Sequence, residues 1–215
     1  MSVAEQWALA PQNDRSAWAP WPLYVLAGGR SSRFGSDKAL AQFRRRPLIA
    51  AATAPFQGLA GPTFAVVDRS DRLEGLGWPC VVDARPFGGP VAGLETALRH
   101  RGEGWLWLAP CDTVGLDVAM LESLRAAARP GLRAVAWRAG AEEADRWQPL
   151  PSLWHADALA VVATALCSGQ RALWQVLDAV GAEAVPLPPN WGQVRSINTM
   201  EALAKAEAES LGEES

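Results

Sequence analysis

A short apolar run that ends in two glycines constrains the fold of this chain most. Residues 22–27 read PLYVLA and are followed by Gly28-Gly29 and a loop that closes at Lys38. An apolar run without polar alternation predicts a strand that is buried on both faces. The glycines predict a tight turn at its carboxyl end. The ordered part of the chain therefore opens with a buried strand that runs into a glycine-rich loop.

The same unit of apolar run, loop and helical segment recurs along the chain. Short connections and apolar strands favour a mainly parallel sheet with helices on both faces. The fold predicted is a Rossmann-like three-layer α/β/α sandwich in a single domain over residues 21–206, with a flexible leader over 1–20 and a frayed tail over 207–215. Further strands are predicted over 63–67, 80–82, 105–109 and 134–137, and helices over 47–52, 91–101, 118–128 and in the Ala/Glu-rich segment 201–215.

Composition excludes several classes of function. The net charge is −3, whereas a surface that binds duplex nucleic acid carries a basic surplus. The one basic cluster, Arg44-Arg45-Arg46, is interpreted as a solvated turn. The three cysteines form no CxxC pair, which speaks against zinc and favours a reducing, cytoplasmic location. No apolar stretch approaches the ~20 residues that span a bilayer.

The loop over residues 26–38, LAGGRSSRFGSDK, has the chemistry of a phosphate site. Glycines let the backbone approach an anion, and successive N–H groups form an anion-binding concavity. Arg33 supplies a planar fork and Lys38 a mobile point charge. The spacing matches neither a Walker A loop nor a dinucleotide fingerprint. A glycine pair after a strand can also be a simple turn, but the two basic residues favour phosphate binding.

Two further segments are predicted at the same edge of the sheet, because each follows a strand. Asp112 comes directly after the strand over 105–109, and a carboxylate there suits Mg²⁺ together with substrate phosphates. Its alternative role is to cap a helix. The segment 83–93 (DARPFGGPVAG) has small residues that would let a sugar or a base lie against the backbone. Its alternative is an ordinary Pro/Gly connection.

These motifs together resemble one family. The loop LAGGRSSRFGSDKAL over 26–40 is similar to the signature LAGG-x-S-x-R-x-G-x-D-K-x-L of the molybdenum cofactor guanylyltransferases. The segments GPVAGL over 89–94 and PCD over 110–112 resemble the next two blocks of that family, in order. Further blocks correspond to Gln148–Trp154 and to SINTMEAL over 196–203, so that the resemblance covers about residues 22–205.

The resemblance implies a fold of the nucleotide-diphospho-sugar transferase type and a nucleotidyltransferase domain over 21–206. The reaction implied is the transfer of GMP from GTP to the phosphate of a molybdopterin-type cofactor, with release of pyrophosphate and with Mg²⁺ as the metal. It also implies partner proteins of cofactor synthesis or recipient molybdoenzymes. The catalytic residues implied are Lys38, Arg33 and Asp112, with Asp112 as metal ligand. The binding residues implied are Leu26, Ala27, Gly28, Gly29, Lys38, Asp83 and Asp112.

The acceptor half of the site is assigned by exclusion, to the segments after Trp137, around Gln148–Trp154 and at 196–199. Asn198 is the sharpest candidate, because an amide can donate to a phosphate and accept from a pterin N–H. Its alternative is to cap a terminal helix that starts near Met200. Rival functions are a cytidylyltransferase for the same cofactor, a transferase for a sugar or lactate phosphate, and a non-catalytic nucleotide-binding adaptor.

Overall fold

A seven-stranded sheet forms the centre of the molecule. In a computed structural model, residues 20–28, 37–85, 88–140 and 145–212 are described. The strand order is β10-β8-β9-β6-β1-β4-β5, and every pairing is parallel except those that involve β9. The predicted mainly parallel sheet is thus confirmed. The strands are β1 (Leu23–Leu26), β4 (Thr63–Val67), β5 (Cys80–Val82), β6 (Trp105–Pro110), β8 (Ala134–Arg138), β9 (Trp147–His155) and β10 (Glu183–Pro186).

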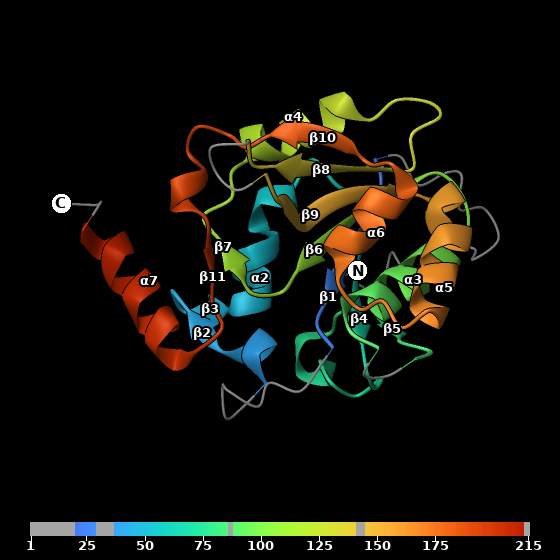
Figure 1. The fold of residues 1–215 in the computed structure, drawn as a ribbon. Helices are drawn as coiled ribbons and strands as arrows, with labels where there is room; N and C mark the ends of the chain where they lie inside the picture. The colour runs from blue at the N-terminus through green and yellow to red at the C-terminus, as the bar shows by residue number, and fades with distance from the viewer. Residues whose placement is uncertain (1–19, 29–36, 86–87, 141–144, 213–215) are drawn as a thin grey trace.

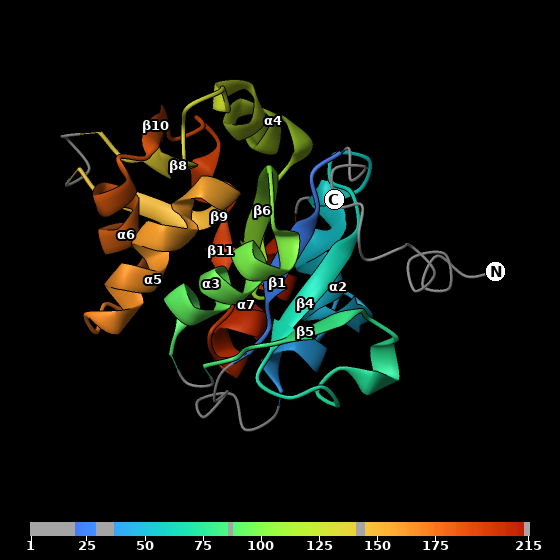
Figure 2. The same ribbon diagram turned by 90° about the vertical axis from the view of Figure 1, so that its right-hand side faces the viewer.

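Helices cover both faces of this sheet (Figures 1 and 2). One face packs against α3 (Pro90–Arg101), α5 (Leu159–Cys167) and α6 (Leu173–Val180). The other packs against α2 (Leu48–Thr53) and α4 (Val118–Ala127). Successive strand residues point to opposite faces, so that Tyr24 lies in the first layer of core and its neighbour Val25 in the second. The three-layer α/β/α sandwich is confirmed.

Strand β9 is the main element that the sequence did not predict, and with it α5, α6 and β10. It runs antiparallel between β6 and β8, in the middle of the sheet, although it contains Pro149 and Pro151. Proline lacks an N–H and argues against a central strand. The ladder with β8 is irregular at this point, because its register shifts between Val135 and Trp137. The prolines fall where that ladder is interrupted.

A smaller layer packs beside α2 (Figure 1). It consists of the hairpin β2 (Gln42–Phe43) and β3 (Arg46–Pro47), the antiparallel ribbon β7 (Thr113–Val114) and β11 (Arg195–Ser196), and α7 (Met200–Gly212). Phe43, Val114, Ile197 and Leu203 share its apolar core. Single-turn 3-10 helices occur at η2 (Lys38–Leu40), η3 (Ala54–Phe56), η4 (Glu74–Leu76), η6 (Ala156–Ala158) and η7 (Trp191–Gln193).

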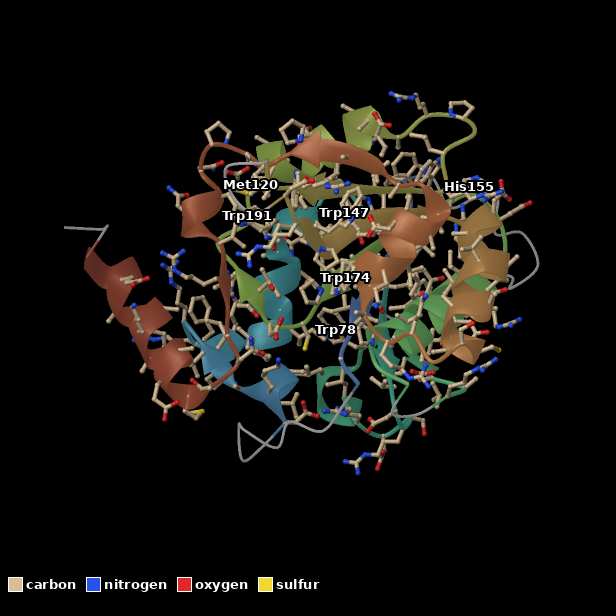
Figure 3. All side chains as sticks on the ribbon, viewed as in Figure 1. Trp78, Met120, Trp147, His155, Trp174 and Trp191 are labelled. Carbon is tan, nitrogen blue, oxygen red and sulfur yellow. The ribbon has the colours of Figure 1, made fainter. Side chains whose placement is uncertain are left out.

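Most of the tryptophans in the described ranges belong to the core or pack against it. Trp107, Trp137 and Trp154 are fully buried, and Trp191 packs edge-on against Trp137 at 5.1 Å between ring centroids. Trp191 lies near Met120 over the α4 side of the sheet, whereas Trp174 lies on α6 and is half-exposed (Figure 3). None of the helices in the described ranges is long and apolar enough to cross a membrane.

Candidate active site

The carboxyl ends of four neighbouring strands form one edge of the sheet. β1 pairs in parallel with both β4 and β6, and β4 pairs with β5. The residues that follow these strands are therefore neighbours: Ala27, Asp68, Asp83 and Asp112. Open α/β sheets bind their ligands at this edge. The predicted placement of Asp83 and Asp112 at one edge is confirmed.

Lys38, Asp112 and Asn198 form a cluster at this edge. The Lys38 Nζ donates to the Asp112 Oδ2 in an ion pair, and it also donates to the Asn198 Oδ1 at 3.1 Å. The side chains of Lys38 and Asp112 are 21% and 12% exposed, so both charges can reach a ligand without being fully solvated. Charged groups in a partly desolvated site attract phosphate more strongly than in open water.

The ribbon β7–β11 brings Asn198 to the site. The Ile197 N–H donates to the Asp112 carbonyl at 2.8 Å, immediately beside the ladder that pairs Thr113 with Ser196. The Asn198 amide nitrogen donates to the Ser196 Oγ at 2.9 Å, which orients the amide oxygen toward Lys38. The first turn of α7 is capped by Thr199, whose Oγ1 accepts from the Ala202 N–H at 3.1 Å. The alternative in which Asn198 caps this helix is therefore wrong.

Arg72 is a site residue that the sequence did not reveal. Its Nε donates to the Asp37 Oδ2 and one terminal nitrogen donates to the Asp68 Oδ1, both at 2.7 Å, and its side chain is 8% exposed. Asp37 in turn accepts from the Ala39 N–H at 3.1 Å and so caps the turn that carries Lys38. Arg72 thus ties the Lys38 turn to the end of β4. The only signal in the sequence was its spacing of four residues from Asp68.

The ion pairs of Arg72 shift the pKa values of Asp68 and of Arg72 itself. Burial by itself would raise the pKa of Asp68, but the hydrogen bond and charge of Arg72 bring that pKa below its ordinary value. Burial likewise works against the charged form of Arg72, yet its bonds to Asp37 and Asp68 raise its pKa. Both groups therefore stay ionised, and Arg72 continues to hold the turn that carries Lys38.

Asp83 is held in place from helix α3. Its Oδ1 accepts from the Thr96 hydroxyl at 3.1 Å and from the Arg85 N–H at 2.9 Å. Thr96 is a second residue that the sequence did not single out. The 83–93 segment turns into α3 at Gly89, whose φ of 74° favours glycine. A Cβ on Gly93 would lie 2.6 Å from Leu26 Cδ2, so this glycine allows close packing of α3 on β1. The expected contact of the 83–93 segment with a sugar or base stays a prediction.

The glycine loop lies only partly within the described residues. Ala27 is buried, and its N–H donates to the Val66 carbonyl at 2.9 Å, which fixes the end of β1. Leu26 packs against the α3 side of the core, and Gly28 is exposed at the edge. Gly29 and Arg33 lie outside the described residues, so their predicted roles stay predictions.

The donor set near Asp112 suits one kind of metal. Within the described ranges, no three His, Cys, Asp or Glu side chains come together as a metal cluster. A single carboxylate is enough for Mg²⁺, which takes its other ligands from water and substrate phosphates. The neighbouring Cys111 does not compete, since burial, followed by the Asp112 charge, raises the pKa of its thiol to about 12. His100 bonds Tyr24 and His155 lies beside Asp157, as structural histidines do.

Lys38 and Asp112 meet at the carboxyl edge of a mostly parallel sheet, which is where open α/β proteins bind nucleotides. The chain belongs to the MobA-like NTP transferase family, since the family's domain model matches residues 23–184. The molybdenum cofactor guanylyltransferase of Pseudomonas aeruginosa is 34% identical over 193 residues, 88% of this chain and 96% of that protein. That of Serratia proteamaculans is 28% identical over 180 residues, 82% and 89% of the two chains.

Solved structures show the same fold. Molybdopterin-guanine dinucleotide biosynthesis protein A from Archaeoglobus fulgidus superposes with a TM-score of 0.73 at 22% identity, over 89% of this chain and 99% of that one. The CMP:2-keto-3-deoxy-manno-octonic acid synthetase superposes with a TM-score of 0.66 at 13% identity, over 90% and 99%. At these identities the likeness establishes the fold, which is that of the nucleotide-diphospho-sugar transferases, as expected from the sequence.

Proposed function

We propose that this enzyme transfers GMP from GTP to the terminal phosphate of a molybdopterin-type molybdenum cofactor and releases pyrophosphate. The curated relatives carry that activity in their names. The observation that carries the proposal is the cluster of Lys38, Asp112 and Asn198 beside the end of β1. It joins the last residue of the predicted phosphate-binding loop, a carboxylate and a C-terminal amide at one edge.

The chain's own groups would position the reactants and neutralise charge. Lys38, with Arg33, would bind the triphosphate and stabilise the leaving pyrophosphate. Leu26, Ala27, Gly28 and Gly29 would present backbone to the nucleoside. Asp83, fixed by Thr96 and Arg85, would contact it from the opposite side. No general base is required, because the attacking cofactor phosphate is already ionised.

Asp112 would hold Mg²⁺ in this scheme. The fit rests on its carboxylate, which is 12% exposed and already pairs with a cation, the Lys38 ammonium. Bound there, Mg²⁺ would supply charge neutralisation at the phosphates. Lys38 would then leave Asp112 and turn to the phosphate oxygens. Asn198 is hydrogen-bonded to Lys38 and would lie at the boundary between the nucleotide and the acceptor.

The acceptor half would be built from segments at the same edge. In-line attack requires the cofactor phosphate to approach from the far side of the α-phosphate. The end of β8 and the beginning of β9 reach this edge, since Arg138 pairs with Trp147 there. The far end of β9 does not, because Trp154 pairs with Leu106 and Ala134 at the start of their strands. The assignment of Gln148–Trp154 to the acceptor is therefore corrected to its first residues.

Nucleotide selectivity tests the proposal. The thermal unfolding midpoint, Tm, is measured with GTP, CTP, ATP or UTP, each with and without Mg²⁺, because a ligand that binds only the native state raises Tm by mass action. GTP with Mg²⁺ should give the largest shift. Pyrophosphate release should then need both GTP and the cofactor. A larger shift with CTP moves the assignment to a cytidylyltransferase, and binding without turnover moves it to an adaptor.

Three further expectations belong to the proposal. The nucleotidyltransferase domain spans residues 21–206, with a leader before it and a tail after it. The three unpaired cysteines favour a cytoplasmic location. The product is handed to a recipient molybdoenzyme or to another protein of cofactor synthesis.

A further inference from the structure

A cavity lies on the side of the β7–β11 ribbon where α2, the β2–β3 hairpin and α7 meet. Its volume is about 360 Å³, within the range of small-molecule sites. Apolar residues form part of its wall, among them Phe43, Val114 and Leu116. Three arginines also line it: Arg44, Arg46 and Arg195. None of the cavity's residues belongs to the candidate active site.

The hairpin that carries two of these arginines has a costly conformation. Arg44 and Arg45 form its two-residue turn with φ angles of 48° and 63°, in the left-handed region. Such a turn favours Asn-Gly, because other residues are strained there. Strain of this kind gathers at sites where a side chain has to be placed for function. The turn predicted for Arg44-Arg45-Arg46 is present, but two of its arginines line a cavity.

The charges in the cavity do not balance. The three arginines line the cavity with one carboxylate, that of Glu209, which pairs with Arg195 at 3.6 Å. The Arg195 guanidinium also donates to the carbonyls of Gly192 and Val194. A second carboxylate lies beside the hairpin, since the Glu207 Oε1 accepts from the Arg44 backbone N–H at 3.0 Å. Arg46 has no side-chain hydrogen bond or ion pair to any described residue. With both carboxylates counted, one positive charge is in surplus, which favours an anion, and the fork of arginine matches a phosphate group.

The wall of the cavity is continuous with the active site. Val114 lies in the cavity and is two residues from Asp112, while Arg195 lies in it and is three residues from Asn198. Arg195 and Val114 are paired in the β7–β11 ladder, and the Ile197 N–H donates to the Asp112 carbonyl at the other end of the ribbon. A ligand that shifts this ribbon displaces two residues of the active-site cluster together.

We propose that this cavity is a second binding site, for a small molecule with a terminal phosphate, and that its occupancy changes nucleotide affinity through the β7–β11 ribbon. Arg46 and Arg195 hold the phosphate, and the apolar wall takes the rest of the molecule. Free phosphate and an organic phosphate ester share this chemistry. The volume of about 360 Å³ suits either of them better than a macromolecule.

Binding is tested by calorimetry on the full chain without Mg²⁺, at constant ionic strength, with inorganic phosphate and with adenosine 5′-monophosphate as probes. Arg46→Gln and Arg195→Gln should weaken binding about ten-fold or more, the loss expected for one charged hydrogen bond. Arg45→Gln is the matched control, because it removes the same charge from the same hairpin but does not line the cavity. Lys38→Ala should retain this binding. Arg44→Gly should raise Tm by relieving the strained turn and still weaken binding.

The two probes distinguish free phosphate from an organic phosphate ester as the ligand. The ester binds more tightly than phosphate alone if the apolar wall of the cavity contributes. The apparent KM for GTP should change on addition of the probe in wild-type and Arg45→Gln enzyme, and not in Arg46→Gln. Equal losses in Arg45→Gln and Arg46→Gln would overturn the proposal, because they show a general charge effect. So would binding that disappears in Lys38→Ala, an unchanged KM for GTP, or an acidic peptide that binds more tightly than both phosphates.

Discussion

The Lys38 ammonium and the Asp112 carboxylate are in direct contact although 74 residues separate them in the sequence. The contact is possible because β1 and β6 are parallel neighbours, with Leu26 opposite Pro110. The loop after β1 and the residues after β6 therefore meet at one edge. The charge of each group is balanced by the other.

Lys38→Ala should lower kcat/KM by about 100-fold, the size of effect expected for a key electrostatic contact to a developing charge. It also leaves the Asp112 carboxylate without its cation, so that Tm should fall by a few degrees. Steady-state kinetics with GTP and the cofactor measure the first effect, and thermal unfolding measures the second. Kinetics equal to those of the wild type would exclude a role for Lys38 in binding the triphosphate.

Asp112→Asn should abolish the dependence of activity on Mg²⁺, because the amide keeps the shape but loses the charge that binds the ion. In the metal-free protein it should change Tm by only a few degrees. The double variant Lys38→Ala/Asp112→Asn should recover the stability lost in Lys38→Ala, because no uncompensated charge remains, while activity stays low. If Asp112→Asn unfolds the chain, its role is structural.

Arg72→Gln should destabilise the fold by about 2 kcal/mol, because it leaves two carboxylates near a buried position without their cation. Arg69→Gln is the control: the Arg69–Asp71 pair is exposed and should contribute well under about 1 kcal/mol. The pKa of Asp68 is lowered in the native state, so its contribution to stability is present above the unfolded value and is lost as pH falls through the lowered one. Urea unfolding at pH 7 and near pH 3 measures both effects, and in Arg72→Gln the decrease in stability between them should be smaller.

The parts of this site that a sequence can reveal are those that follow one strand each. Asp83 and Asp112 were predictable because an apolar run ends just before them, and parallel strands end at one edge. Arg72 was not, because its partner Asp37 is 35 residues away and follows another strand. Thr96 was hidden for the same reason, since its bond to Asp83 depends on how α3 packs. Pairings of this kind depend on tertiary structure and have no local pattern.

The fold was predictable as far as its strands carried a local signal. Strand β9 was not predicted, because Pro149 and Pro151 are typical of a loop. Its central position depends on an irregular register with β8 that has no local sequence signal. Because β9 was not recognised as a strand, the segments of α5, α6 and β10 that follow it were not assigned to the sheet either. The role of Asn198 was open for a related reason, because the cap of α7 is set by which of two adjacent polar residues faces the first turn.

Cys111 should stay unreactive toward iodoacetamide at neutral pH while the exposed Cys167 reacts, because the Cys111 thiol is buried and protonated. Burial, followed by the Asp112 charge, raises the pKa of Cys111 from 9.0 to about 12 in the native state. Stability is therefore unaffected below pH 9 and decreases from pH 9 toward pH 12, by at most about 1.4 kcal/mol per pH unit. Cys111→Ala should decrease less steeply than Cys167→Ala over this range, and equal slopes would contradict the buried thiol.

Asn198→Ala should raise the apparent KM for the cofactor and leave the affinity for GTP nearly unchanged. The reason is that the Asn198 amide bonds Lys38 on one side and Ser196 on the other, and the proposed function assigns it to the acceptor. Thr199→Ala is the matched control, because Thr199 caps α7 and its loss should cost about 1 kcal/mol of stability without changing either KM. The two variants thus distinguish an effect on the cofactor KM from an effect on stability. Titration of GTP and cofactor separately against both variants, with Tm measured alongside, distinguishes them. An unchanged cofactor KM in Asn198→Ala would exclude it from the acceptor site, and the amide would then serve only to orient Lys38.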